Sequence, residues 1–144
     1  DLSTSLHQDY VFDLDRRTAT TGNTGPYLQY AHARSSRILR NAAELGLEIP
    51  DAVTLLDAPE EQALALLLSR FGEVVADVGV NLQPHKLCGY LYDLATALSS
   101  FYENCPVLKS EGEVRASRLA VCAATRKVLA RGLYLLGIEA PEQM

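Results

Sequence analysis

Residues 26–45 read PYLQYAHARSSRILRNAAEL, and this stretch decides the fold class. Its apolar side chains recur at spacings close to the 3.6-residue period of an α-helix, at Leu28, Ala31, Ile38, Leu39, Ala42 and Leu45. Pro26 suits the first turn of a helix, and Gly46 followed by Pro50 is an ordinary stop signal. The stretch therefore predicts one amphipathic helix over residues 26–45.

The same period continues through most of the remaining chain. It predicts three further helices, at residues 57–82, 84–105 and 111–137. Within the second of these, we expect Gly72 and Gly79 to mark close packing against a neighbour. Four amphipathic helices with short connections bury their apolar stripes most simply as a bundle. The sequence thus predicts an all-α fold, an antiparallel helix bundle of four or more helices.

Residues 1–25 follow a different pattern. Residues 9–15 alternate weakly between apolar and polar side chains, which is typical of a strand or extended arm, and residues 18–25 are small, polar and glycine-bearing. The acidic side chains within this segment are Asp9, Asp13 and Asp15, and Arg16 and Arg17 follow them directly, which favours a solvated, neutralised segment. We predict a short extended arm and loop ahead of a bundle at residues 26–144, and interpret residues 1–25 as the tail of a preceding domain.

Composition excludes several classes of protein. The chain has 144 residues, of which 48% are hydrophobic and 22% charged, so it is neither disordered nor large enough for several domains. No apolar run approaches the ~20 residues of a membrane span, so no membrane partner is expected. Three cysteines form no CxxC pattern, and the histidines have no metal-ligand spacing. We expect the cysteines to be small buried hydrophobes in a reducing, cytoplasmic setting, with no metal.

Charge is distributed unevenly along the chain. The net charge of −5 gives no electrostatic reason to expect DNA or any other nucleic acid. Residues 41–104, however, carry ten acidic and two basic side chains, whereas residues 1–40 have a net charge of +1 and residues 105–144 of +2. The positive charge is therefore concentrated at the two ends of the sequence.

Two stripes of side chains are candidates for binding RNA. On the first predicted helix a single face carries Tyr27, Tyr30, Arg34 and Arg37. Aromatic rings stack on unpaired bases and guanidinium groups bind phosphates, although the tyrosines would also fit the edge of a core and the arginines a solvated face. The last predicted helix carries Arg115, Arg118 and Arg126. If these two helices are neighbours, the stripes would flank one positive groove.

The sequence contains no motif for catalysis. It has no glycine-rich phosphate loop, no Gly-x-Ser-x-Gly and no His-Glu-x-x-His, and no carboxylate cluster has a plausible metal geometry. We therefore assign no catalytic residue.

Several segments, in order along the chain, resemble the arginyl-tRNA synthetase family. The run Gly22-Asn23-Thr24-Gly25-Pro26-Tyr27-Leu28-Gln29-Tyr30-Ala31-His32-Ala33-Arg34 is similar to the junction between its catalytic core and its C-terminal anticodon-binding domain. The resemblance continues at residues 70–75, 84–95, 101–107, 115–119 and 137–144. The family's Asp-Ala-Leu-Arg (DALR) signature reads Asp93-Leu94-Ala95-Thr96 here, so we carry no role onto Thr96.

This resemblance implies a class I aminoacyl-tRNA synthetase that activates arginine with ATP and Mg²⁺ in a catalytic domain of the same chain. The family's His-Ile-Gly-His and Lys-Met-Ser-Lys-Ser motifs are absent, so the fragment alone should be inactive and hold no cofactor. The resemblance also implies that residues 1–25 are the tail of the catalytic domain with its junction loop, and that residues 26–144 bind the anticodon stem-loop of tRNA(Arg).

The resemblance also assigns residues to tRNA binding. The expected contacts are Asn23, Thr24, Tyr27, Tyr30, Arg34, Arg37, Arg115, Arg118 and Met144, which is similar to the family's usual terminal residue. For Arg115 and Arg118, pairing with Glu111 or Glu113 along the helix is the alternative. One other function stays open: a truncated or paralogous helical scaffold or interaction domain without tRNA recognition. The equivalent domain of another class I synthetase, such as the cysteine enzyme, is disfavoured because the run Gly22–Arg34 fits the arginine enzyme much better.

Overall fold

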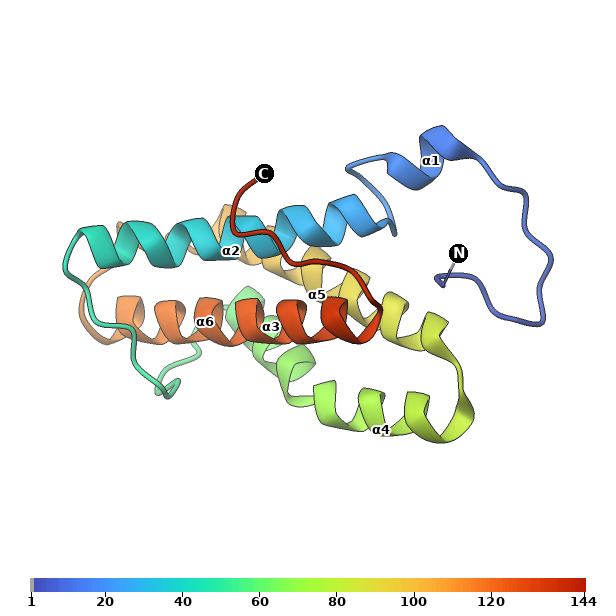
Figure 1. Cartoon of the computed structure of the whole chain (residues 1–144). Coiled ribbons are helices and arrows are strands. Elements are labelled where there is room, and N and C mark those ends of the chain that lie inside the picture. The colour runs from blue at the N-terminus through green and yellow to red at the C-terminus, as the bar shows by residue number, and fades with distance from the viewer. Residues whose placement is uncertain (1) are drawn as a thin grey trace.

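A computed structural model describes residues 2–144, which form six helices and no strand (Figure 1). Their bounds are α1 Leu14–Thr18, α2 Gly25–Glu44, α3 Pro59–Ser69, α4 Phe71–Asn81, α5 Pro84–Asn104 and α6 Gly112–Leu135. The long helices α2, α5 and α6 lie alongside one another, and α6 runs opposite to the other two (Figure 1). The predicted all-α bundle is confirmed, and α2 and α6, the first and last long helices, are neighbours.

The core lies where α2, α3, α5 and α6 meet. Its fully buried side chains include Leu64 of α3, Phe101 of α5 and Leu129 of α6. Each such side chain contributes about 1.5–3 kcal/mol by leaving water. At the α5–α6 contact a Cβ atom on Gly132 would lie 2.5 Å from Cδ2 of Leu91, so these helices approach as closely as they do only because residue 132 is a glycine.

The predicted helix over residues 57–82 is two helices instead of one. The hydrogen-bond ladder breaks at Arg70, whose backbone N–H donates to the carbonyl of Leu67. The break lets α3 pack on both α5 and α6, while α4 packs on α5 and against the end of α3. A Cβ atom at Gly72 or Gly79 would meet nothing within 4 Å, so the predicted close packing at these glycines is absent among residues 2–144.

The arm ahead of the bundle also departs from its prediction in part. Residues 9–13 are irregular, as in an extended arm, but residues 14 and 15 of the predicted strand or arm instead begin α1. The reason is local: Asp13 is extended, and its carboxylate accepts a hydrogen bond from the backbone N–H of Arg16 at 3.1 Å, which caps the new helix. Arg17 lies over the ring of Tyr10, which ties the arm to α1.

The cysteines are free and buried, as predicted. Burial raises the pKa of the Cys122 thiol to about 12, so this group stays protonated and behaves as a hydrophobe. Within residues 2–144, no three His, Cys, Asp or Glu side chains come together in a way that would hold a metal ion. The helices described there are also too short or too polar to cross a membrane.

Candidate nucleic-acid interface

A groove of about 880 Å³ runs along one side of α2. Three segments from distant parts of the sequence form its walls: the face of α2, the end of α5 with the loop that follows it, and the last three residues of the chain. Basic side chains in its lining outnumber acidic ones by four to two: Arg34, Arg37, Arg40 and Lys109 against Glu103 and Glu142. The groove is thus a positive surface on a chain of negative net charge.

Arg34 lies at the centre of the aromatic part of this groove. Its guanidinium carbon is 4.2 Å from the ring centroid of Tyr102 on α5 and 5.4 Å from that of Tyr30 on α2. Both tyrosines keep close to half of their surface exposed, at 46% and 43%. Cation–π attraction holds the guanidinium against both rings, and the exposed parts of the two tyrosines are available for stacking.

The C-terminal segment reaches the groove because three residues of α2 and one of α6 hold it. Gly137, with φ of 73°, ends α6 and turns the chain back. Residues 138–144, which we call the C-terminal strap, then cross α2 (Figure 1). Gln29 donates to the carbonyl of Glu139 at 2.9 Å, and Nδ1 of buried His32 lies 2.8 Å from the carbonyl oxygen of Pro141. A carbonyl only accepts, so this nitrogen carries the proton.

The last contact of the strap is an ion pair. Arg126 of α6 donates through Nη2 to Glu142 at 2.5 Å and through Nε to Ser36 of α2 at 2.9 Å. The hydrogen bond from Arg126 to Glu142, with hydrogen bonding by Ser36 and the charge of Arg126, lowers the pKa of Glu142. The pair fixes the end of the strap, and Gln143 and Met144 consequently line the groove.

Four of the residues predicted from the sequence meet in this groove: Tyr30, Arg34, Arg37 and Met144. Tyr27 does not. It packs partly buried against Tyr92 of α5, with ring centroids 5.7 Å apart, although it lies on the same face of the helix. Its place one turn earlier on α2 brings it beside α5 instead of over the groove, so the four-residue stripe divides into a packed tyrosine and a groove-lining part.

Asn23 and Thr24 lie in a second, smaller hollow beside the arm. Thr24 caps α2: its hydroxyl accepts from the backbone N–H of Tyr27 at 3.3 Å and donates to the carbonyl of Ala19. Asn23 is exposed. A contact of either residue with RNA stays a prediction.

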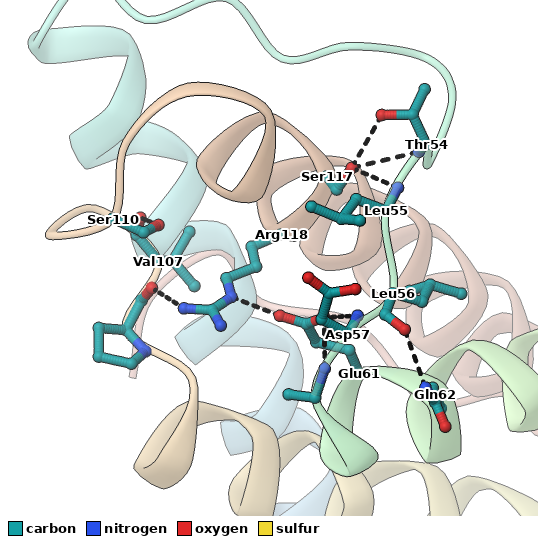
Figure 2. Close-up of polar contacts among 12 residues, drawn as sticks. Thr54, Leu55, Leu56, Asp57, Glu61, Gln62, Val107, Ser110, Ser117 and Arg118 are labelled. Carbon is teal, nitrogen blue, oxygen red and sulfur yellow. Dashed lines mark hydrogen bonds and ion pairs between the residues drawn. The ribbon is translucent and has the colours of Figure 1, made fainter.

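The three arginines that were predicted on the last helix lie in different environments. Arg118 points into the protein, where Nε donates to Glu61 of α3 at 2.5 Å and Nη1 donates to the carbonyl of Pro106 at 2.8 Å (Figure 2). Arg126 holds the strap, and Arg115 is half-buried. None of the three lines the groove, which corrects the expectation of two arginine stripes on its sides. Arg115 and Arg118 as RNA contacts stay predictions.

The Arg118–Glu61 ion pair connects segments of the fold (Figure 2). Glu61 is buried, and its second carboxylate oxygen accepts from the backbone N–H groups of Asp57 and Ala58 at the start of α3. Burial alone would raise the pKa of Glu61, but these hydrogen bonds and the charge of Arg118 outweigh it and hold the pKa below its ordinary value. The pair joins α3, α6 and the loop after α5, which forms one wall of the groove.

Four groove residues were missed in the sequence analysis: Arg40, Tyr102, Lys109 and Gln143. Arg40 was predictable, because it continues the spacing of Arg34 and Arg37 along the same helix. Tyr102 and Lys109 had no such signal, since their place depends on how the end of α5 and its loop pack against α2.

The fold and this groove define the class of the molecule: a helical-bundle domain that carries a basic and aromatic surface. The sequence profile of the DALR anticodon binding domain matches residues 28–144, and the chain belongs to that family.

The proteins most similar in sequence within this family include arginine–tRNA ligases. The chain is 62% identical to part of the arginine–tRNA ligase of Cutibacterium acnes and 52% identical to part of that of Frankia casuarinae, over its whole length in both cases. It spans 28% and 24% of those two proteins and matches their C-terminal part.

Solved structures of arginyl-tRNA synthetases also contain a domain with this fold. The Thermus thermophilus arginyl-tRNA synthetase superposes with a TM-score of 0.79 at 40% identity, covering 88% of this chain and 22% of its own. The Plasmodium falciparum enzyme superposes with a TM-score of 0.87 at 32% identity, covering 100% of this chain and 25% of its own.

Proposed function

We propose that this chain binds the anticodon stem-loop of tRNA(Arg), as the C-terminal quarter of an arginine–tRNA ligase. The observation that carries the proposal is the contact of Arg34 with two partly exposed tyrosines, Tyr30 and Tyr102, in a groove with further cations. Unpaired bases stack on aromatic faces and guanidinium planes, while neighbouring arginines and lysines hold phosphates. An anticodon loop offers both unpaired bases and a phosphate backbone.

The reaction itself belongs to a catalytic domain upstream in the same parent chain. That domain would use ATP with Mg²⁺ to activate arginine and transfer it to the tRNA, and this chain would place the tRNA for it. Residues 1–25 would then be the tail of that domain and the junction to residues 26–144. Free, buried cysteines fit the cytoplasm, where we place the protein.

The test is fluorescence-anisotropy binding at low salt. One probe is an RNA hairpin with the anticodon stem-loop of tRNA(Arg), and the second differs in the central anticodon base. Arg34→Ala removes the groove cation that contacts the tyrosines. Arg131→Ala is its matched control, because Arg131 also lies against a tyrosine, 5.2 Å from the ring centroid of Tyr134, but outside the groove.

We expect tighter binding to the first hairpin, weakened by Arg34→Ala and unchanged by Arg131→Ala. Equal binding to both hairpins would contradict anticodon recognition. Equal loss in both variants would contradict the groove as the site. Absence of binding would favour a scaffold without tRNA recognition.

A further inference from the structure

The end of α4 carries a leucine in a conformation that suits leucine poorly. Leu82 caps α4 with φ of 54° and ψ of 44°, and it is the one non-glycine residue with positive φ among residues 2–144. Glycine and asparagine tolerate this left-handed conformation, whereas a leucine side chain is strained there. The side chain gains little from its own fold in return, because 73% of it is exposed.

The surface around Leu82 is apolar and uncovered. Val80 is 81% exposed, and α4 buries none of its residues fully. The exposed positions of α4 include the small residues Gly72, Ala76 and Gly79, beside the polar Glu73, Asn81 and partly exposed Asp77. Large apolar side chains that stay exposed next to one another, as Val80 and Leu82 do, are a feature of surfaces that bind a partner.

The position of this surface indicates what covers it. The α4–α5 connection, which contains Leu82, lies toward the same end of the bundle as the N-terminal arm (Figure 1). That arm has large exposed side chains of its own, including Val11 at 90% and Phe12 at 62%. The chain corresponds to the C-terminal 28% of its Cutibacterium acnes relative, so in that enzyme most of the sequence lies before the arm.

We propose that Val80 and Leu82 form a docking surface for the catalytic domain of the same parent chain. This inference rests on the proposed function, because that function supplies the catalytic domain. An RNA partner does not fit: the nearby cation, Lys86, is paired with Asp77 at 2.8 Å, and apolar side chains offer phosphates nothing.

The test compares the isolated chain with a full-length fusion in which the chain replaces the matching part of the Cutibacterium acnes enzyme. Hydrogen exchange reports whether the backbone amides of residues 79–83 are covered. We expect exchange at these amides to be at least tenfold slower in the fusion than in the isolated chain. Equal exchange in the two proteins would overturn the proposal.

Two variants connect the protection to the side chain. Leu82→Asn keeps a residue that tolerates the left-handed conformation, so the isolated variant should unfold at an equal or higher denaturant concentration. In the fusion it should lose the tenfold protection of residues 79–83. Leu45→Asn is the matched control, because Leu45 also caps a helix and is 65% exposed. It follows the C-terminal end of α2, which lies at the opposite end of the bundle from the α4–α5 connection (Figure 1). Full protection in the Leu82→Asn fusion would overturn the proposal.

The remaining outcomes separate this proposal from the function on which it rests. Hairpin binding by the isolated chain tests tRNA recognition, and Leu82→Asn should leave it unchanged. Failure of the unmodified chain to bind RNA would contradict the proposed function, while exchange in the fusion would still decide the docking surface. Protection that is already present in the isolated chain and depends on its concentration would identify a second copy as the occupant and overturn the proposal.

Discussion

Arg34 reaches from α2 to Tyr102 at the end of α5, where its guanidinium carbon lies 4.2 Å from the ring centroid. This contact crosses the groove between two helices that are distant in sequence. It holds a cation in place before any ligand arrives, which reduces the conformational entropy that binding would otherwise cost. Tyr102 remains 46% exposed beside this contact, so part of its side chain is accessible to a base.

Loss of the Tyr102 ring should weaken RNA binding. We expect Tyr102→Leu to lower the affinity for the anticodon hairpin by about 5- to 150-fold, since a stacked base contributes about 1–3 kcal/mol. Tyr102→Phe should bind like the unmodified chain, because the ring remains. The measurement is anisotropy at one fixed salt concentration. Tyr134→Leu on α6 is the control, and normal binding by Tyr102→Leu would rule out stacking on this ring.

Removal of a groove cation should change the salt dependence of binding. We expect Arg37→Gln to reduce the slope of log K against log salt by about 0.7–0.9, which corresponds to one lost phosphate contact. Lys127→Gln removes an exposed cation outside the groove and should leave the slope unchanged. Titrations at several salt concentrations measure both slopes. The same change in both variants would indicate a general effect of net charge.

The bundle could be predicted from sequence because its helices are amphipathic and have clear stop signals. The break at Arg70 could not, because the apolar period runs through it and only packing against α5 and α6 shows where the ladder ends. Local spacing found Tyr30, Arg34 and Arg37, which share one helix. It could not find Tyr102, since no local pattern tells which residue of α5 will face α2.

Removal of the Arg118 side chain should destabilise the fold and leave the groove cations intact. In Arg118→Met the buried carboxylate of Glu61 loses its charged partner, which costs about 3–5 kcal/mol of the free energy of unfolding. Arg115→Met is the matched control, a half-buried arginine of the same helix, and should cost much less. Denaturant unfolding measures both. Hairpin affinity that falls in Arg118→Met while the protein is still folded would support Arg118 as an RNA contact.

The effect of Arg118→Met should depend on pH. The folded-state pKa of Glu61 is lowered, so its ion pair stabilises the protein above the unfolded pKa of about 4.5, and this stabilisation is lost as the pH falls through the folded pKa. The difference in unfolding free energy between the unmodified chain and Arg118→Met should therefore be largest near pH 7 and shrink toward pH 3. Unfolding curves at several pH values measure it, and a constant difference would contradict an ionic origin.

The charge of Glu142 should act on RNA binding through the position of the C-terminal strap. Glu142→Lys places two cations side by side, because Arg126 occupies the partner position. The added positive charge by itself would strengthen attraction to RNA. We expect weaker binding instead, by about three- to tenfold, because repulsion releases the strap and removes Gln143 and Met144 from the groove. Anisotropy with the anticodon hairpin measures the change.

Reversal of the pair separates strap position from charge. The double variant Arg126→Glu and Glu142→Lys restores opposite charges, and we expect it to recover most of the affinity although Ser36 loses its bond to Arg126. Carboxypeptidase digestion gives a readout without RNA: Met144 should be released faster from Glu142→Lys than from the unmodified chain or the double variant. Tighter RNA binding by Glu142→Lys would show that charge alone matters and that the strap does not form part of the site.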